Sequence, residues 1–193
     1  AESDRKARQF IRRAISKNPA AYVLVTGCFS QRSPQAVGAI EGVDYICGSA
    51  NKTSVLQAAL ALTEKGEKNA SPEYAVQSLE GAGFEKMIIT HFERTRAYVK
   101  IEDGCENHCA YCAIPSARGR VRSKAPCDVI AEVEALVAGG CREIVLTGIE
   151  TASYGRDLEG VTLADLLCRV DAIPGIGRVR LGSLDPSLIR PRF

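Results

Sequence analysis

The stretch DGCENHCAYCAIP, residues 103–115, places Cys105, Cys109 and Cys112 in one short segment with the spacing C-x3-C-x2-C. Thiolate is a soft ligand that suits zinc or iron–sulfur clusters. Structural zinc usually takes four protein ligands, and no fourth Cys or His follows at a matching spacing. Three thiolates would leave one iron of a four-iron cluster open to an outside ligand. A zinc site completed by a distant cysteine is the alternative interpretation.

The chain around and beyond this segment alternates between short β-branched runs and amphipathic runs. We expect strands at 97–102, 143–147 and 178–183, and helices at 125–140 and 162–173. The order βαβαβ predicts a parallel sheet with right-handed crossovers. The working loops of such sheets follow the carboxyl ends of the strands. These loops begin at Asp103, Gly148 and Ser183, so the cysteine segment is the first of them.

The N-terminal part of the chain shows a similar alternation. We expect helices at 3–17 and 52–62 and strands at 22–26 and 43–47, which together predict a small α/β layer domain. The polar stretch after it is typical of a linker or surface loop, with one more strand at 87–90. The predicted division is a domain at 1–64, a linker at 65–96 and a second domain at 97–193.

Composition excludes several classes of protein. The chain has 193 residues and 46% hydrophobic residues, as is ordinary for a globular protein. Its formal net charge of +2 is too small to indicate by itself a nucleic-acid partner. No apolar run is long enough to span a membrane. The eight cysteines are clustered rather than spread as in a secreted disulfide framework, which favours the cytoplasm. We expect Cys47, Cys127, Cys141 and Cys168 to be small buried residues.

The cysteine spacing, in a loop after the first strand of a parallel βα unit, resembles the radical S-adenosylmethionine (SAM) family. The resemblance implies that Cys105, Cys109 and Cys112 hold a 4Fe-4S cluster and that SAM binds the open iron. It implies cleavage of SAM to methionine and a 5′-deoxyadenosyl radical, which abstracts hydrogen from the substrate. Tyr111, just before the last cysteine, matches an aromatic position of the family and is expected near the adenine.

Further stretches narrow the resemblance. VLVTGCFSQRSP (23–34), LTGIETASYGRDL (146–158) and RLGSLDP (180–186) look like the methylthiotransferases, a transferase family. The most similar branch modifies N6-threonylcarbamoyladenosine beside the tRNA anticodon and adds a methylthio group at carbon 2. The resemblance implies an N-terminal α/β domain followed by a partial TIM barrel with parallel strands. A C-terminal RNA-binding (TRAM) domain would complete the family's architecture.

The same resemblance assigns residues to sites. Cys28 matches one of three cysteines that hold a second 4Fe-4S cluster in the family, and the other two have no counterpart here. The stretch from Thr147 through Gly148 to Glu150 matches the segment that binds the methionine part of SAM. Ser183 is a further SAM contact at the third strand end. A solvated loop carboxylate is an equally good interpretation of Glu150, and a turn serine is the alternative for Ser183.

A basic run, ARGRVRSK, follows the cysteine segment at residues 117–124. If this run is extended, Arg118, Arg120 and Arg122 lie on one side and can contact phosphates of RNA. A solvated basic loop is the alternative.

The resemblance implies tRNA as substrate, a flavodoxin-type electron donor, no membrane partner and a monomer. We also expect the chain to be a fragment, because it starts at Ala1 inside an apparent helix. A methylthiotransferase that acts on a ribosomal-protein side chain and a zinc-stabilised RNA-binding module without catalysis remain as alternative functions.

Overall fold

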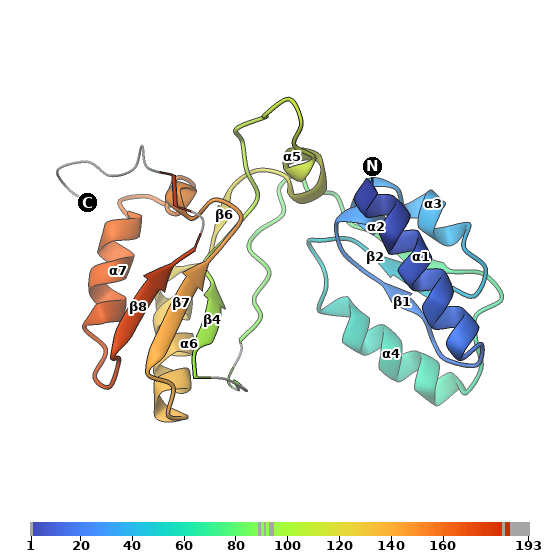
Figure 1. Cartoon of the computed structure of the whole chain (residues 1–193), viewed down its shortest axis with the longest axis horizontal. Coiled ribbons are helices and arrows are strands. Elements are labelled where there is room, and N and C mark those ends of the chain that lie inside the picture. The colour runs from blue at the N-terminus through green and yellow to red at the C-terminus, as the bar shows by residue number, and fades with distance from the viewer. Residues whose placement is uncertain (1, 89, 91, 93–94, 183, 186–193) are drawn as a thin grey trace. The chain divides into compact units, whose positions relative to one another are not determined.

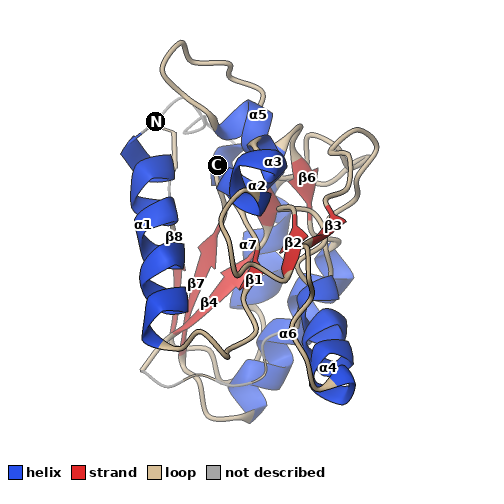
Figure 2. Cartoon of the chain, turned by 90° about the vertical axis from the view of Figure 1, so that its right-hand side faces the viewer, coloured by secondary structure: helices blue, strands red, loops and turns tan. Residues whose placement is uncertain are grey.

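The computed structural model describes residues 2–88, 90, 92, 95–182 and 184–185. The chain divides into two compact units, each with its own parallel sheet (Figure 1). Each unit also has its own hydrophobic core. The first unit is Ala1–Glu85 together with Ser116–Arg118, and the second is Lys86–Pro115 with Gly119–Phe193. The predicted α/β class with parallel strands is confirmed (Figure 2). None of the described helices is long and apolar enough to cross a membrane.

The first unit is built on a three-stranded parallel sheet of order β1-β2-β3. Its elements are α1 (Glu2–Lys17), β1 (Leu24–Val25), α2 (Cys28–Arg32), α3 (Pro34–Gly38), β2 (Tyr45–Cys47), α4 (Ser54–Lys65) and β3 (Glu73–Ala75). Its core contains Ile11, Val37, Ile40, Val43 and Ile46. Strand β3 lies in the polar stretch where we expected a linker or surface loop.

Strand β3 reaches its place because a buried carboxylate holds the segment before it. Asp44 has no solvent exposure, and its carboxylate accepts from the Lys68 ammonium at 2.7 Å and from the Asn69 backbone N–H at 3.1 Å. The Val23 backbone N–H donates to the same carboxylate at 2.7 Å. One side chain thus ties the segments that lead into β1 and β3 to the start of β2.

The second unit contains the parallel sheet that we predicted, with the order β4-β7-β8, and a short antiparallel ribbon. Its elements are β4 (Ala97–Lys100), β5 (Glu102–Asp103), the start of α5 (Ile114–Arg118), β6 (Arg122–Ser123), α6 (Pro126–Ala138), β7 (Glu143–Thr147), the 3-10 turn η1 (Thr151–Ser153), α7 (Leu163–Asp171) and β8 (Arg178–Leu181). Residues 87, 88 and 90 form no strand, so that expectation was wrong for the described part of 87–90.

The core of the second unit lies between its sheet and helices α6 and α7. Val99, Ile144 and Leu146 are fully buried, and they belong to the same cluster as Leu136 of α6 and Leu166 of α7. Alternate residues along a strand point to opposite faces of a sheet. This core therefore uses every second residue of β4 and β7.

Two of the four cysteines that we expected to be buried are exposed. Cys47 and Cys141 are buried, as predicted, but Cys127 and Cys168 are exposed. The buried positions of α6 are Val129, Glu132, Val133 and Leu136, a spacing that leaves Cys127 on the outer face. Cys168 likewise falls between the buried positions of α7.

A buried ion pair joins Lys124, the residue after β6, to α6. The Lys124 ammonium donates to the Glu132 carboxylate, and both residues are 1% exposed. A buried charge that loses its partner is far more costly than an exposed one, because water does not replace the lost interaction.

We predict that Glu132→Ala lowers the free energy of unfolding by about 3–5 kcal/mol, because Lys124 remains buried without its carboxylate. Urea unfolding of the chain measures this. Glu134→Ala, on the exposed face of the same helix, is the matched control and should change stability by less than ~0.5 kcal/mol. Equal losses for the two variants would contradict the prediction.

Candidate functional site

The cysteine loop begins where strand β5 ends, and its base is held by close backbone contacts. The Cys105 N–H donates to the Gly119 carbonyl at 3.1 Å. Gly104 has a φ of +92°, and a Cβ there would lie 1.9 Å from the Arg120 carbonyl oxygen. Only glycine fits this approach. The sequence DGC therefore has a glycine where the outgoing and returning chains of the loop meet.

Within the loop, a turn joins two of the cysteines. The Cys112 N–H donates to the Cys109 carbonyl at 2.9 Å, which closes the C-x2-C segment into a turn. His108 has a φ of +46°, the one positive φ among the described non-glycine residues. That left-handed conformation is rare outside glycine. The loop thus has a specific local shape and is not an extended strand.

The three thiols offer the donor set that a thiolate-ligated cluster needs. Cys109 is exposed, Cys105 and Cys112 are partly exposed, and none of the three is in a disulfide. Among the described residues, no group of three or more His, Cys, Asp or Glu lies close enough to hold one metal ion. An iron–sulfur cluster spreads its thiolates over different iron atoms. The three thiols therefore offer the right donor chemistry from one loop, but the described conformation does not gather them around one point.

Tyr111 lies at the turn between Cys109 and Cys112 and is 92% exposed. Nearly the whole ring is therefore still in contact with water in this structure. The ring can therefore bury area against a planar ligand at this loop.

The loop after strand β7 lies beside the start of the cysteine loop. Lys100 of β4 is paired in register with Thr147 of β7, and the Ile101 N–H donates to the Thr147 carbonyl at 2.8 Å. Because parallel strands end at the same edge of a sheet, the residues after Lys100 and after Thr147 lie close together. The structure thus brings the predicted stretch from Thr147 to Glu150 to the base of the cysteine loop.

Glu102 joins these two loops. It has no solvent exposure, and its Oε2 accepts from the backbone N–H groups of Ile149 and Glu150, each at 2.9 Å. A Cβ on Gly148 would lie 2.6 Å from the same oxygen. The other carboxyl oxygen, Oε1, is buried and has no hydrogen-bond partner among the described residues.

Burial raises the pKa of Glu102 from 4.5 to about 7, and the negative charge of Asp103 acts in the same direction. The two backbone donors and Lys100 lower the pKa but do not overcome the burial. The folded state therefore keeps a proton that the unfolded chain releases near pH 4.5. By linkage, stability falls as pH rises from 4.5 through 7, by about 3 kcal/mol for this shift.

Glu150 itself caps the short turn η1. Its Oε1 accepts weakly from the Ala152 N–H at 3.4 Å, while its own N–H is held by Glu102. The carboxylate is partly exposed. Ser183, the predicted residue at the third strand end, lies outside the described residues.

The antiparallel ribbon β5–β6 connects the cysteine loop to the loop after β7. The Ser123 N–H donates to the Asp157 carboxylate at 2.8 Å, and the Ser123 hydroxyl accepts from the Gly155 N–H at 2.8 Å. The Tyr154 hydroxyl donates to the Lys124 carbonyl at 2.9 Å, and burial raises the pKa of Tyr154 to about 12. This tyrosine therefore stays a neutral donor at physiological pH.

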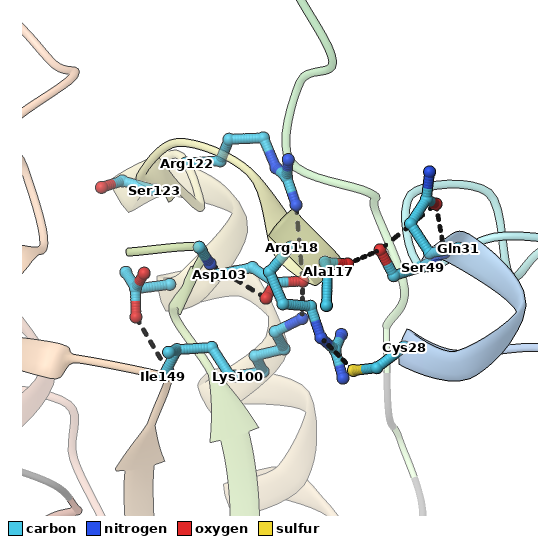
Figure 3. Close-up of polar contacts among 12 residues, drawn as sticks. Cys28, Gln31, Ser49, Lys100, Asp103, Ala117, Arg118, Arg122, Ser123 and Ile149 are labelled. Carbon is cyan, nitrogen blue, oxygen red and sulfur yellow. Dashed lines mark hydrogen bonds and ion pairs between the residues drawn. The ribbon is translucent and has the colours of Figure 1, made fainter. Parts of the chain in front are cut away.

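The three predicted RNA-binding arginines do not share one extended strand, so that geometric expectation was wrong. Arg118 ends helix α5 and belongs to the first unit. Arg120 has a side chain that is 91% exposed, with Glu106 at 4.0 Å. Arg122 is 6% exposed and lies 3.6 Å from the Asp103 carboxylate, which Lys100 also contacts, at 2.5 Å (Figure 3).

Cys28 lies at the first position of helix α2 and has a basic neighbour. The Arg118 Nε–H donates to the Cys28 sulfur at 3.2 Å within the first unit (Figure 3). The Ala117 carbonyl accepts from the Ser49 hydroxyl at 2.7 Å, which fixes the backbone next to Arg118. One thiol does not make a cluster site, so the described residues of this unit hold one candidate ligand and not a complete set.

Comparisons with known proteins relate the chain to one superfamily and to one group of named enzymes. Residues 99–190 match the Radical SAM superfamily. The chain is 40% identical over 189 residues to the threonylcarbamoyladenosine tRNA methylthiotransferase MtaB of Bacillus subtilis, an alignment that covers 96% of this chain and 41% of that protein. The protein of the same name from Thermotoga maritima is 37% identical over 186 residues, which cover 95% of this chain and 41% of the relative.

A relative with another name is similar to nearly the same degree. The tRNA-2-methylthio-N(6)-dimethylallyladenosine synthase of Clostridium botulinum is 38% identical over 175 residues, or 89% of this chain and 38% of that protein. The chain spans about two fifths of the length of the curated relatives that it matches. Residues 99–190 are thus similar to the radical SAM superfamily, and nearly the whole chain is similar to the tRNA methylthiotransferases named above.

Proposed function

We propose that the chain is part of a radical SAM tRNA methylthiotransferase that adds a methylthio group at carbon 2 of N6-threonylcarbamoyladenosine next to the anticodon. The observation that carries the proposal is the loop with three thiols at the carboxyl end of β4, beside the loop after β7. Relatives named for this reaction are similar over nearly the whole chain. We propose a radical SAM domain at 97–193 and an N-terminal domain that extends beyond the expected boundary at 64, because β3 completes its sheet.

Cys105, Cys109 and Cys112 are the proposed ligands of a 4Fe-4S cluster. When bound, the cluster and SAM supply the 5′-deoxyadenosyl radical that starts the reaction. The backbone and hydroxyl groups from Thr147 to Glu150 would hold the methionine part of SAM, with Ser183 as a further contact. The exposed ring of Tyr111 would cover the adenine of SAM.

Cys28 is proposed as one ligand of a second 4Fe-4S cluster, whose other ligands would come from outside this chain. The Arg118 Nε–H donates to this sulfur, so the thiol lies beside a charged side chain and not in an apolar core. This contact also gives Arg118 a role other than phosphate binding.

Of the predicted RNA contacts, Arg120 is the one that its exposure supports best. Arg118 donates to Cys28, and Arg122 faces the buried Asp103. Phosphate binding needs a guanidinium that reaches solvent. We therefore propose that Arg120 makes the main phosphate contact of the basic run, with smaller contributions from Arg118 and Arg122.

A second candidate substrate is tRNA that carries N6-dimethylallyladenosine, because a relative named for that product is 38% identical to this chain. The assay uses the full-length protein with SAM, a sulfide source and a reductant under anaerobic conditions, on tRNA carrying either modified adenosine. Mass spectrometry of digested tRNA should find a nucleoside heavier by one CH2S unit in threonylcarbamoyl-modified tRNA. Modification of only the dimethylallyl substrate, or of a ribosomal protein, would contradict the proposed specificity.

The remaining proposals follow from the family. The reaction needs an electron, for which a flavodoxin-type protein is the proposed donor. We propose a cytoplasmic monomer.

We predict that replacing Cys105, Cys109 and Cys112 together by Ala abolishes cluster loading. After anaerobic reconstitution, wild-type protein should carry about four iron atoms and absorb broadly near 400 nm, as thiolate-ligated clusters do. The matched control replaces Cys127 and Cys168, two exposed cysteines outside the loop, and should load normally. Zinc in place of iron in the wild-type protein would favour the zinc-stabilised RNA-binding module.

We predict that Arg120→Ala weakens tRNA binding and reduces the slope of log K against log salt by about 1, the loss of one phosphate contact. Binding is measured by fluorescence anisotropy across a salt series. Arg142→Ala is the control, because Arg142 is also exposed but precedes β7 at the opposite end of the sheet. Equal effects of the two substitutions would show that the basic run makes no specific contact.

A further inference from the structure

We infer that Glu102 is a positioning residue that orients the loop from Gly148 to Glu150 for SAM binding. The inference rests on the proposed function, since it concerns the same SAM site. Glu102 lies at the first position of the ribbon strand β5, and no part of it is exposed to solvent. A ligand in solvent therefore cannot contact Glu102 directly, and the residue acts through the loop that it holds.

The contact is directional. Oε2 of Glu102 accepts from two consecutive backbone N–H groups, those of Ile149 and Glu150, at 2.9 Å each. In a trans peptide the N–H and the C=O point in opposite directions. The carbonyl groups of Gly148 and Ile149 therefore point away from Glu102. These carbonyls are acceptors of the kind that the amino group of a methionine moiety needs.

The packing leaves the loop little freedom to turn. Gly148 approaches Glu102 so closely that a Cβ would lie 2.6 Å from Oε2 and 3.1 Å from the Glu102 carbonyl oxygen. A rotated loop would lose both hydrogen bonds and bury unpaired N–H groups, which is costly. The single carboxyl group thus selects one orientation of the backbone.

The carboxyl group keeps its proton to a higher pH than an exposed glutamate does. Burial and the neighbouring Asp103 oppose its ionisation, while Lys100 and the two backbone donors favour the ionised form. Lys100 is already engaged by Asp103 at 2.5 Å. Glutamine has the same shape and offers an oxygen acceptor without a titrating proton. Methionine has a similar size but offers no such acceptor.

The experiment compares Glu102→Gln with Glu102→Met in the full chain with its cluster reconstituted. SAM affinity is measured by anaerobic calorimetry without reductant, so that SAM is not cleaved. We expect the Gln variant to bind SAM within about twofold of wild type and the Met variant to bind on the order of tenfold or more weakly, as expected from the loss of two hydrogen bonds. Glu134→Met, on an exposed helix face, is the control for the substitution.

A second measurement does not need SAM. Between pH 5 and pH 8 the melting temperature of wild type should fall more than that of the Gln variant, because only wild type loses the proton of Glu102. In hydrogen exchange, the Ile149 and Glu150 amides should be protected in wild type and the Gln variant. If the Met variant does not fold, Gly148→Ala, which places a Cβ against Oε2, replaces it with the same expected loss of SAM affinity.

The outcomes separate the inference from the proposed function. Wild-type protein that carries a cluster but binds no SAM would overturn both. Wild type that binds SAM, with a folded Met variant of equal affinity, would overturn the positioning role alone. Loss of SAM binding in a Gln variant with protected amides would also overturn it, since the hydrogen-bond acceptor would then not be the cause.

Discussion

The parallel pairing of β4 with β7 is the constraint on which the candidate site depends. The register that places Lys100 opposite Thr147 makes the two strands end together. The site lies at the shared carboxyl end of these strands, because the chain leads from β4 into the cysteine loop and from β7 into the loop of Gly148. A slip of one residue would turn Glu102 toward the other face and separate it from Ile149 and Glu150.

The apolar layer beneath the sheet holds that register. Val99, Ile144 and Leu146 are fully buried against α6 and α7. The residues between them along each strand point to the other face of the sheet, away from this core. The polar groups of the site lie beyond the strand ends, where the apolar layer stops. The fold therefore separates the residues that stabilise it from those that would bind a cofactor.

Much of this architecture could be predicted from the sequence, because long elements carry a periodic signal. Strand β7 was predicted at its observed bounds, and α7 and β8 within two residues. The ribbon β5–β6 and strand β3 could not be predicted, because each is only two or three residues long and is held by partners distant in sequence. Tertiary contacts rather than local preference form such elements.

The candidate site shows the same limit. The cysteine spacing is local, so the loop could be identified from the sequence alone. Glu102 was missed, although one signal was present: a carboxylate at the end of the apolar strand run AYVKIE. Its partners, Ile149 and Glu150, are far away in sequence. Helix α5, which ends at Arg118, could not be predicted either, because Pro115 is compatible with a helix start or a turn. Arg118 was therefore expected in an extended run.

The ribbon has a consequence for how the cysteine loop tolerates change. Glu102 and Asp103 pair with Ser123 and Arg122, so both ends of the loop are fastened at one place within the sheet domain. The entropic cost of bringing the two ends of the loop together is therefore part of the folding of that domain and not of metal binding. Oxidation of the thiols, or loss of a cluster bound to them, would therefore leave the domain beneath the loop folded.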